Sequence, residues 1–239
     1  MTYCVGIKTK SGLIALADTR ISSGLGVSSA KKIYFNEKYE GSLFLMTSGL
    51  RSIRDKVVAY FDDKYSLSMG NVNKMYKAVN LYGEQVKRVA IEDEKSLKKS
   101  HYSFDIHTII GGQLKDDAEH KLFLVFPEGN WVEVTEDSPY ALIGNINFGK
   151  PILKRKLTFD SDMETALKLA FISFDAARNN VSDVDFPIDT MYYGKGNFEF
   201  KQKRYTQEEM LAVSKSWSEE LIKAVDNLPN GWTDELLTI

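Results

Sequence analysis

The chain has 239 residues, with 31 basic and 33 acidic side chains and a formal net charge of −2. Its 43% hydrophobic and 27% charged residues are typical of a globular protein and exclude a disordered or fibrous one. Basic and acidic residues are interspersed along the sequence, whereas nucleic-acid binders usually carry a basic surplus or stripe. We therefore expect no nucleic-acid partner and one domain over residues 1–239.

The apolar segments and the cysteine and histidine residues argue against further classes of protein, namely membrane, disulfide-bonded and zinc-binding proteins. Leu13–Ala17 is typical of the apolar runs, and its five residues fall far short of the roughly 18 that a membrane helix needs. We expect no membrane partner and no cleaved signal peptide. The single cysteine, Cys4, excludes an intramolecular disulfide and predicts a cytoplasmic location. No helical i, i+4 spacing relates the histidines, His101, His107 and His120, so we expect no metal, although the spacing leaves carboxylate sites for Mg²⁺ open. We expect no cofactor.

The first part of the chain predicts strands followed by two helices. Residues 9–12 read as a tight turn between the first two strands, so these strands should form a hairpin. Polar, Gly-rich Thr19–Ala30 predicts a loop. Helical spacing of apolar residues begins after Gly49 and predicts a first helix there. The same spacing predicts a second helix over Asn71–Leu97. The expected strands are Thr2–Lys8, Leu13–Ala17, Lys32–Phe35 and Ser42–Met46.

The second part predicts another block of strands and then helices and strands in turn. A short helix is expected near Lys150–Lys156 and an amphipathic one over Asp162–Asn179, with Ser161 as its N-cap. Thr206 and Glu209 form a capping box for a last helix that ends near residue 226. The expected strands are Ile106–Ile110, Leu122–Phe126, Trp131–Val134, Ala141–Ile143, and two that begin at Thr190 and Phe198.

This order of elements predicts the fold class. Strands joined by short turns pair antiparallel, and the helices arrive in segregated groups, so we expect an α+β protein. Its layers should run helix, sheet, sheet, helix: a four-layer αββα sandwich of two antiparallel sheets flanked by helix pairs. Residues 228–239 are a candidate C-terminal tail, which either binds a partner through its apolar residues or folds back on the domain.

The N-terminus is a candidate chemical site. Thr2 follows the initiator Met1, which is generally removed before small residues, so Thr2 would carry a free α-amine. Such an amine has a pKa of about 7.7 to 8.0 and accepts a proton near neutral pH. A threonine hydroxyl activated by its own amine is an established nucleophile. Cys4 is a competing nucleophile, although a thiol inside a strand is usually a small core residue.

Two charged positions strengthen this hypothesis. Asp18 ends the strand that should pair with the first strand, which places it near Thr2. Lys31 and Lys32 open the next strand, and alternation sends them to opposite faces, so one of them can point inward toward Asp18. A cation there would favour the neutral amine and stabilise the deprotonated hydroxyl.

These residues together resemble the proteasome β-subunits, a family of N-terminal-nucleophile hydrolases with the αββα sandwich. The resemblance rests on Thr2 after Met1, residues 3–7, the Ala17–Arg20 segment, Lys31-Lys32, and Ser48-Gly49 before a helix. Within that family the sequence is most similar to the bacterial Anbu type, the ancestral β-subunit. The segments that carry this further likeness are Ile143-Gly144, Phe148–Ile152, Ser173–Asp175 and Pro187–Asp189.

The resemblance implies roles for individual residues. Thr2 would be the nucleophile and its amine the base, Lys32 would tune both, and Asp18 would orient Lys32. Gly49 would donate its backbone N–H to the oxyanion. Ser182 matches the family's supporting serine, whereas Asn179 and Asn145 stand where the family has a supporting aspartate and a glycine-loop serine.

The resemblance also implies a substrate and an assembly. It predicts a threonine peptidase or amidohydrolase acting on a peptide or unfolded protein, within a ring or helical homo-oligomer whose interfaces involve the helix pairs. The departures at Asn145 and Asn179 motivate an alternative from another class: a catalytically weak or inactive assembly protein that binds peptides. Retention of Met1 would favour this alternative, because it would cap the amine.

Overall fold

The computed structural model describes residues 2–23, 26–36, 41–68 and 70–237. Met1, whose removal the nucleophile hypothesis requires, lies outside them. The chain is a mixed α/β protein, with six helices and three antiparallel sheets in the described residues. It divides into two compact units, residues 1–205 and 206–239. Among the described residues, no helix is both long and apolar enough to cross a membrane.

The first five-stranded sheet carries the N-terminus of the chain. The first two strands form the predicted hairpin, with Cys4 opposite Ala17. In spatial order its strands are β10 (Tyr140–Gly144), β1 (Tyr3–Thr9), β2 (Gly12–Asp18), β11 (Ile188–Gly194) and β12 (Phe200–Tyr205). One face of this sheet packs against α4 (Met163–Arg178), which is preceded by the short α3 (Lys150–Lys156).

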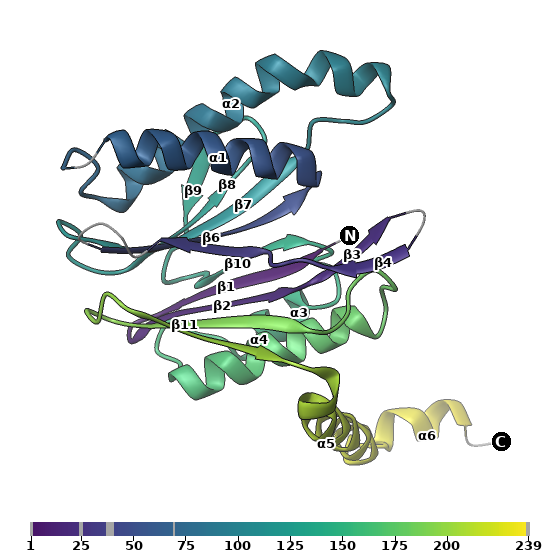
Figure 1. The fold of residues 1–239 in the computed structure, drawn as a ribbon. Coiled ribbons are helices and arrows are strands. Elements are labelled where there is room, and N and C mark those ends of the chain that lie inside the picture. The colour runs from purple at the N-terminus through teal and green to yellow at the C-terminus, as the bar shows by residue number, and fades with distance from the viewer. Residues whose placement is uncertain (1, 24–25, 37–40, 69, 238–239) are drawn as a thin grey trace. The chain divides into compact units, whose positions relative to one another are not determined.

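The second five-stranded sheet lies opposite the first. Helices α1 (Arg51–Leu67) and α2 (Met75–Lys99) cover its outer face (Figure 1). Its strands in spatial order are β5 (Ile33–Asn36), β6 (Gly41–Gly49), β7 (Ile106–Leu114), β8 (Lys121–Val125) and β9 (Trp131–Glu133).

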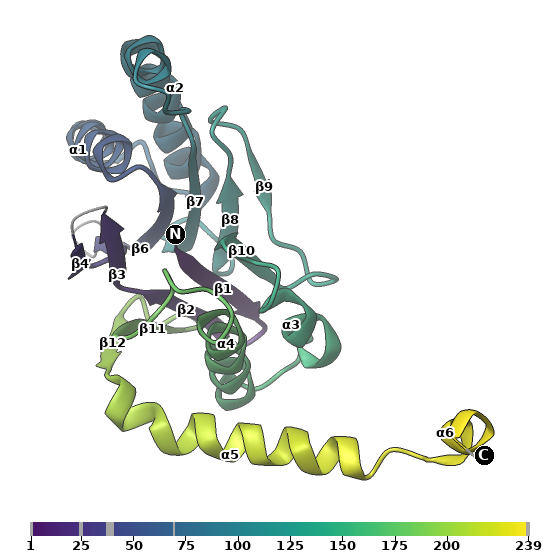
Figure 2. The ribbon, with the colours of Figure 1, turned by 90° about the vertical axis from the view of Figure 1, so that its right-hand side faces the viewer.

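Apolar cores hold these layers together. Cys4, Leu13, Phe44 and Ile109 belong to the core between the two sheets, and residues of α1, α2 and the second sheet form another core. Every residue of β1 and β2 is buried, because each of these strands has a packed layer on both faces. Figure 2 shows the sheets facing each other, with one helix pair on either side. A strand that begins at Tyr3 therefore places Thr2 directly at the edge of this packed interior.

Three local predictions were wrong. Within Thr19–Ala30, the described residues form the strands β3 (Arg20–Ser23) and β4 (Gly26–Ser29), which pair as a two-stranded ribbon. The N-cap of α4 is Asp162 and not Ser161, and α2 begins at Met75.

The C-terminal unit contains α5 (Gln207–Asp226) and α6 (Gly231–Leu237). The predicted capping box is present, since Thr206 accepts from the Glu209 backbone and Glu209 accepts from the Thr206 backbone. Part of the proposed tail, residues 228–239, is thus helical, and its last two residues lie outside the described ones. The single domain with a C-terminal tail stays a prediction.

His120 anchors the far end of β1. The residue is 1% exposed, and its Nε2 lies 2.7 Å from the carbonyl oxygen of Thr9. Because a carbonyl only accepts, Nε2 carries the hydrogen. Burial lowers the pKa of His120 below its ordinary value of 6.5, against the opposing effect of this hydrogen bond. The folded protein therefore disfavours the charged ring.

This burial predicts a pH-dependent stability. Near and below pH 6.5 the unfolded chain binds a proton that folded His120 excludes, so the stabilisation is full above that pH and declines as pH falls. Between about pH 7.5 and about pH 5.5, we expect the free energy of unfolding to fall further in the wild type than in His120→Gln. The two slopes should differ by at most about 1.4 kcal/mol per pH unit. Urea denaturation at both pH values measures this, and equal slopes would contradict it.

Candidate active site

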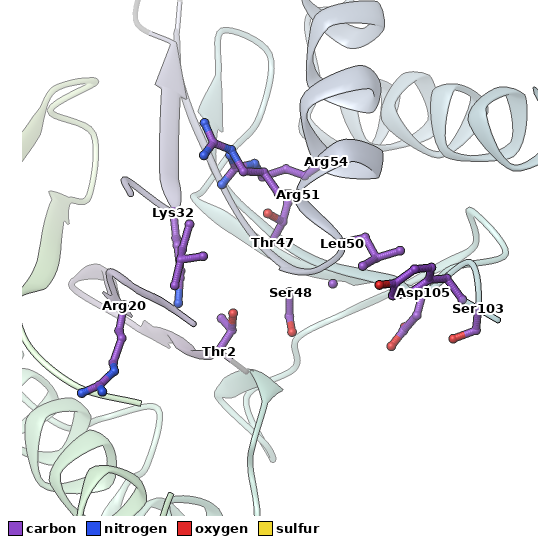
Figure 3. Close-up of a pocket in the computed structure, with 13 residues that line it drawn as sticks. Thr2, Arg20, Lys32, Thr47, Ser48, Leu50, Arg51, Arg54, Ser103 and Asp105 are labelled. Atoms are coloured by element: carbon purple, nitrogen blue, oxygen red, sulfur yellow. The ribbon is translucent and has the colours of Figure 1, made fainter. Parts of the chain in front are cut away.

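Thr2 lies at the mouth of a cavity between the two sheets. It immediately precedes β1, and alternation places it on the same face as Cys4, which packs toward the second sheet. The cavity has a volume of about 540 Å³. Its wall opposite Thr2 is formed by the end of β6 at Thr47–Gly49 and by the beginning of α1 (Figure 3). The side chain of Thr2 is therefore accessible to a molecule in this cavity.

The backbone around Thr2 is fixed from two sides. Asp18 accepts a hydrogen bond from the Tyr3 N–H at 2.8 Å, and the Asn145 N–H donates to the Thr2 carbonyl at 2.8 Å. Gly144 has a φ of +87°, and a Cβ there would lie 1.8 Å from the Thr2 carbonyl oxygen. Only glycine permits this close approach. The backbone at the start of β1 is thus held in place by its neighbours.

Asp18 and Lys32 form a buried ion pair beside Thr2. Lys32 Nζ lies 2.7 Å from Asp18 Oδ1, and the two side chains are 5% and 0% exposed. Burial raises the pKa of Asp18 above its ordinary value, and the cation of Lys32 opposes that rise. Lys31 is exposed while Lys32 is buried, so the expected alternation of the two lysines is confirmed. Since Asp18 ends β2 and Lys32 precedes β5, the pair connects the two sheets.

Gly49 lies on the other side of the cavity. Its φ is +130°, and a Cβ would come within 2.1 Å of the Asp105 carbonyl oxygen on the neighbouring strand connection. Gly49 is therefore required by the chain geometry at the end of β6. Its backbone also lines the same cavity as Thr2.

Cys4 lacks the surroundings of a nucleophile. The side chain is fully buried between the sheets, and burial raises the pKa of its thiol. A protonated, inaccessible thiol is a core residue. Within the described part of the chain, no cluster of three or more His, Cys, Asp or Glu side chains is arranged to hold a metal ion.

The remaining predicted residues do not line the cavity. Ser182 is exposed in the segment after α4, and Asn179 is the exposed C-cap of that helix, with its amide 3.4 Å from Asp175. Asn145 contacts Thr2 through its backbone N–H. None of the three is among the described residues that line the cavity.

Several lining residues escaped the sequence analysis. Arg51 and Arg54 lie in the first turn of α1, directly after Ser48-Gly49, and Asp105 lies just before β7. Arg20 belongs to a segment that carried the family resemblance, but it was given no role. The sequence did contain a signal for Arg51 and Arg54: they are spaced i, i+3 and follow Gly49, the candidate oxyanion donor.

The fold and this terminal site define a proteasome-like protein. No protein-family model and no curated protein matches the sequence, but solved structures do. Anbu (ancestral β-subunit) from Yersinia bercovieri is 30% identical with a TM-score of 0.86, and the alignment covers 95% of this chain and 97% of that one. The chain belongs to the Anbu family.

Two further structures agree with this assignment. The helical assembly of the Anbu complex from Pseudomonas aeruginosa is 27% identical, with a TM-score of 0.88 and coverage of 95% and 97%. An Anbu (Gly-1) mutant from Hyphomicrobium sp. strain MC1 is 29% identical, with a TM-score of 0.87 and coverage of 96% and 98%. The resemblance inferred from the sequence is thereby confirmed.

The buried ion pair predicts an asymmetric response to mutation. Lys32→Met leaves the Asp18 carboxylate buried without its cation, so we expect the free energy of unfolding to fall by about 3 to 5 kcal/mol. The double variant Asp18→Asn/Lys32→Met should lose less, because the introduced amide carries no charge and its oxygen still accepts from the Tyr3 N–H. Chemical denaturation of both variants measures the difference.

A matched control comes from a solvent-exposed ion pair. Arg51 Nε lies 3.3 Å from Asp55 Oδ2, with the two side chains 65% and 53% exposed. Asp55→Asn should change the free energy of unfolding by less than about 1 kcal/mol. A double variant as unstable as Lys32→Met would show that the buried charge is not the cause.

Proposed function

We propose that this protein is an N-terminal threonine peptidase or amidohydrolase. The observation that carries the proposal is one cavity that brings Thr2 close to the buried Asp18–Lys32 pair and to the backbone of Gly49. A peptide or unfolded segment is the proposed substrate, since the cavity opens to solvent beside Thr2. The αββα sandwich of the N-terminal-nucleophile hydrolases is the fold that we propose for the layers described above.

The proposed reaction begins with the α-amine of Thr2 as base. With Met1 removed, this amine has an unperturbed pKa of about 7.7 to 8.0 and takes the proton of the Thr2 hydroxyl. Oγ attacks the substrate carbonyl carbon and forms a tetrahedral intermediate. The cation of Lys32 disfavours a second positive charge on the amine, and Asp18 holds that cation in place.

Completion of the cycle requires an oxyanion donor and water. In the proposal the Gly49 N–H donates to the developing oxyanion, an interaction worth about 2.7 to 4 kcal/mol where it has been measured by mutation. The intermediate collapses as the amine returns its proton to the leaving nitrogen, which releases an amine product and leaves an ester on Thr2. Water, deprotonated by the freed amine, then attacks the ester carbonyl; the bond to Oγ breaks, the carboxylic acid product leaves, and the protonated amine returns the proton to Oγ, which restores Thr2.

Self-association is part of the proposal. One similar structure is described as a helical assembly of the Anbu complex, and we propose a ring or helical homo-oligomer for this chain as well. Helix pairs on the outer faces are its proposed interfaces. The single cysteine agrees with a reducing cytoplasmic compartment.

A second candidate function rests on the outer shell of the site. Ser182 and Asn179 are exposed and do not line the cavity, and an amide at position 179 lacks the charge of the carboxylate found in the family. This favours a catalytically weak or inactive assembly protein that binds peptides without hydrolysing them. The two functions differ in whether Thr2 becomes acylated.

Intact mass spectrometry tests the proposed nucleophile. The natively expressed protein is measured with and without a threonine-directed peptide epoxyketone or β-lactone. We expect the untreated mass to lack Met1 and the treated sample to gain one inhibitor mass per chain, because the Thr2 hydroxyl opens the β-lactone to form an ester, and the hydroxyl and the free amine together react with the epoxyketone. Thr2→Ala, which lacks the hydroxyl, should gain none.

Each contrary outcome has a definite meaning. An adduct that persists in Thr2→Ala would assign the reactivity to another residue. A retained Met1 without an adduct would rule out the peptidase and leave the assembly protein as the better description. Lys32→Gln is a second informative variant: at a temperature where its circular dichroism matches that of the wild type, it should slow adduct formation, although Thr2 keeps both its hydroxyl and its amine.

A further inference from the structure

The cavity beside Thr2 has an unusual balance of charges. Four of its lining residues are cations, and Asp105 is the acidic residue among those that the structure describes there; the cations are Arg20, Lys32, Arg51 and Arg54. The whole chain, by contrast, has a formal net charge of −2. The positive wall is therefore a local property of this cavity.

Two of the four cations are already neutralised by partners. Lys32 pairs with buried Asp18, and Arg20 Nη1 lies 2.7 Å from Asp185 Oδ2. In Figure 3 the side chain of Arg20 extends away from the other arginines. Neither residue has charge to spare for a ligand.

The charges of Arg51 and Arg54 are not neutralised one by one as those of Lys32 and Arg20 are, because the two arginines share one carboxylate. Arg54 Nε and Nη2 lie 2.9 and 2.7 Å from Asp55 Oδ1, and Arg51 Nε lies 3.3 Å from Asp55 Oδ2. Among the described residues, Arg51 makes no other hydrogen bond, so its two terminal amino groups face solvent at the cavity rim. Figure 3 shows both guanidinium groups above Thr47 on the side of Lys32. Two cations therefore share one carboxylate, and within the described part of the chain Asp105, whose Oδ1 lies 3.1 Å from His107 Nδ1, pairs with neither of them.

The position of these arginines in the helix is unfavourable without a ligand. They occupy the first turn of α1, which has no acidic residue and no side-chain cap. The positive end of the helix dipole lies there, so cations in this turn are disfavoured and an anion is favoured. Placing two arginines at this end costs stability that a bound carboxylate would restore.

We propose that the cavity selects peptides with an acidic side chain next to the carbonyl that Thr2 attacks. Arg51 and Arg54 receive the glutamate or aspartate carboxylate, because a guanidinium pairs with a carboxylate through two parallel charge-assisted hydrogen bonds. The proposal rests on the proposed function for the identity of the reacting carbonyl. The two arginines are specificity-determining residues and take no part in the chemical step.

A binding experiment in the Thr2→Ala background tests the selection without requiring turnover. The probes are two fluorescent peptides with amidated C-termini that differ only in one residue, glutamate or glutamine. By fluorescence anisotropy at low salt, we expect the glutamate peptide to bind at least about tenfold more tightly, the usual scale for a charge-assisted pair. Added sodium chloride should reduce that ratio, because salt screens an exposed pair.

Variants of the two arginines identify the residues responsible. Arg51→Gln/Arg54→Gln should bring the ratio close to one, and Arg51→Glu should favour a peptide with lysine at the same position. Arg88→Gln is the matched control, since Arg88 is half-exposed, pairs with Glu92 on α2 at i, i+4 and does not line the cavity. The ratio should not change in that variant.

Three results would overturn the proposal. They are equal binding of the two peptides, a ratio that survives the double arginine variant, and no binding of either peptide at millimolar concentration. The outcome is separate from that of the proposed function: charge-selective binding without a Thr2 adduct would retain the selectivity and reject the peptidase.

Discussion

The buried contact between Asp18 and Lys32 is the interaction on which the rest of the site depends. It joins the end of a strand in the first sheet to the start of a strand in the second sheet, at the edge where Thr2 begins the chain's first strand. The same carboxylate also accepts from the Tyr3 N–H. One side chain therefore fixes the strand that carries Thr2 and the cation that faces it. Because both charges are buried, neither is tolerated without the other.

Close backbone contacts complete this arrangement. The carbonyl of Thr2 fits against Gly144, and Gly49 fits against the backbone of Asp105, and both contacts exclude a Cβ. Glycine at these two points lets each strand end approach its neighbour closely. A residue next to the start of a chain, as Thr2 is, has few covalent constraints, so its position must come from neighbours. Here backbone and buried charge provide those constraints, and the hydroxyl remains accessible.

The charges around the cavity separate into two kinds. Asp18–Lys32 and Arg20–Asp185 are closed pairs, whereas Arg51 and Arg54 share a single aspartate at the rim. A buried pair such as Asp18–Lys32 positions groups and is screened little by salt, whereas a cluster at an exposed rim attracts a charged ligand and is salt-dependent. At 27–30% identity to the similar Anbu structures, the charge of this rim has to be derived from the chain's own residues.

The sequence by itself determined the features that follow from local pattern. Alternation and a tight turn gave the first hairpin, the Thr206 capping box began α5, and alternation at Lys31-Lys32 turned one lysine inward toward Asp18. Tertiary structure decided the outcome where the local sequence favoured two residues equally for one role, or favoured none. Ser161 and Asp162 are both good caps, but the Ser161 hydroxyl accepts from the Thr158 N–H, which leaves Asp162 to cap α4.

The charged wall of the cavity also came only from the tertiary structure. Arg51 and Arg54 meet Thr2 because the two sheets face each other, and no sequence period reports a contact between separate sheets. For the same reason, Ser182 and Asn179 matched a family pattern in the sequence and yet do not line the cavity. Local periodicity encodes which face of an element is buried, whereas the packing of distant elements decides which side chains share a site.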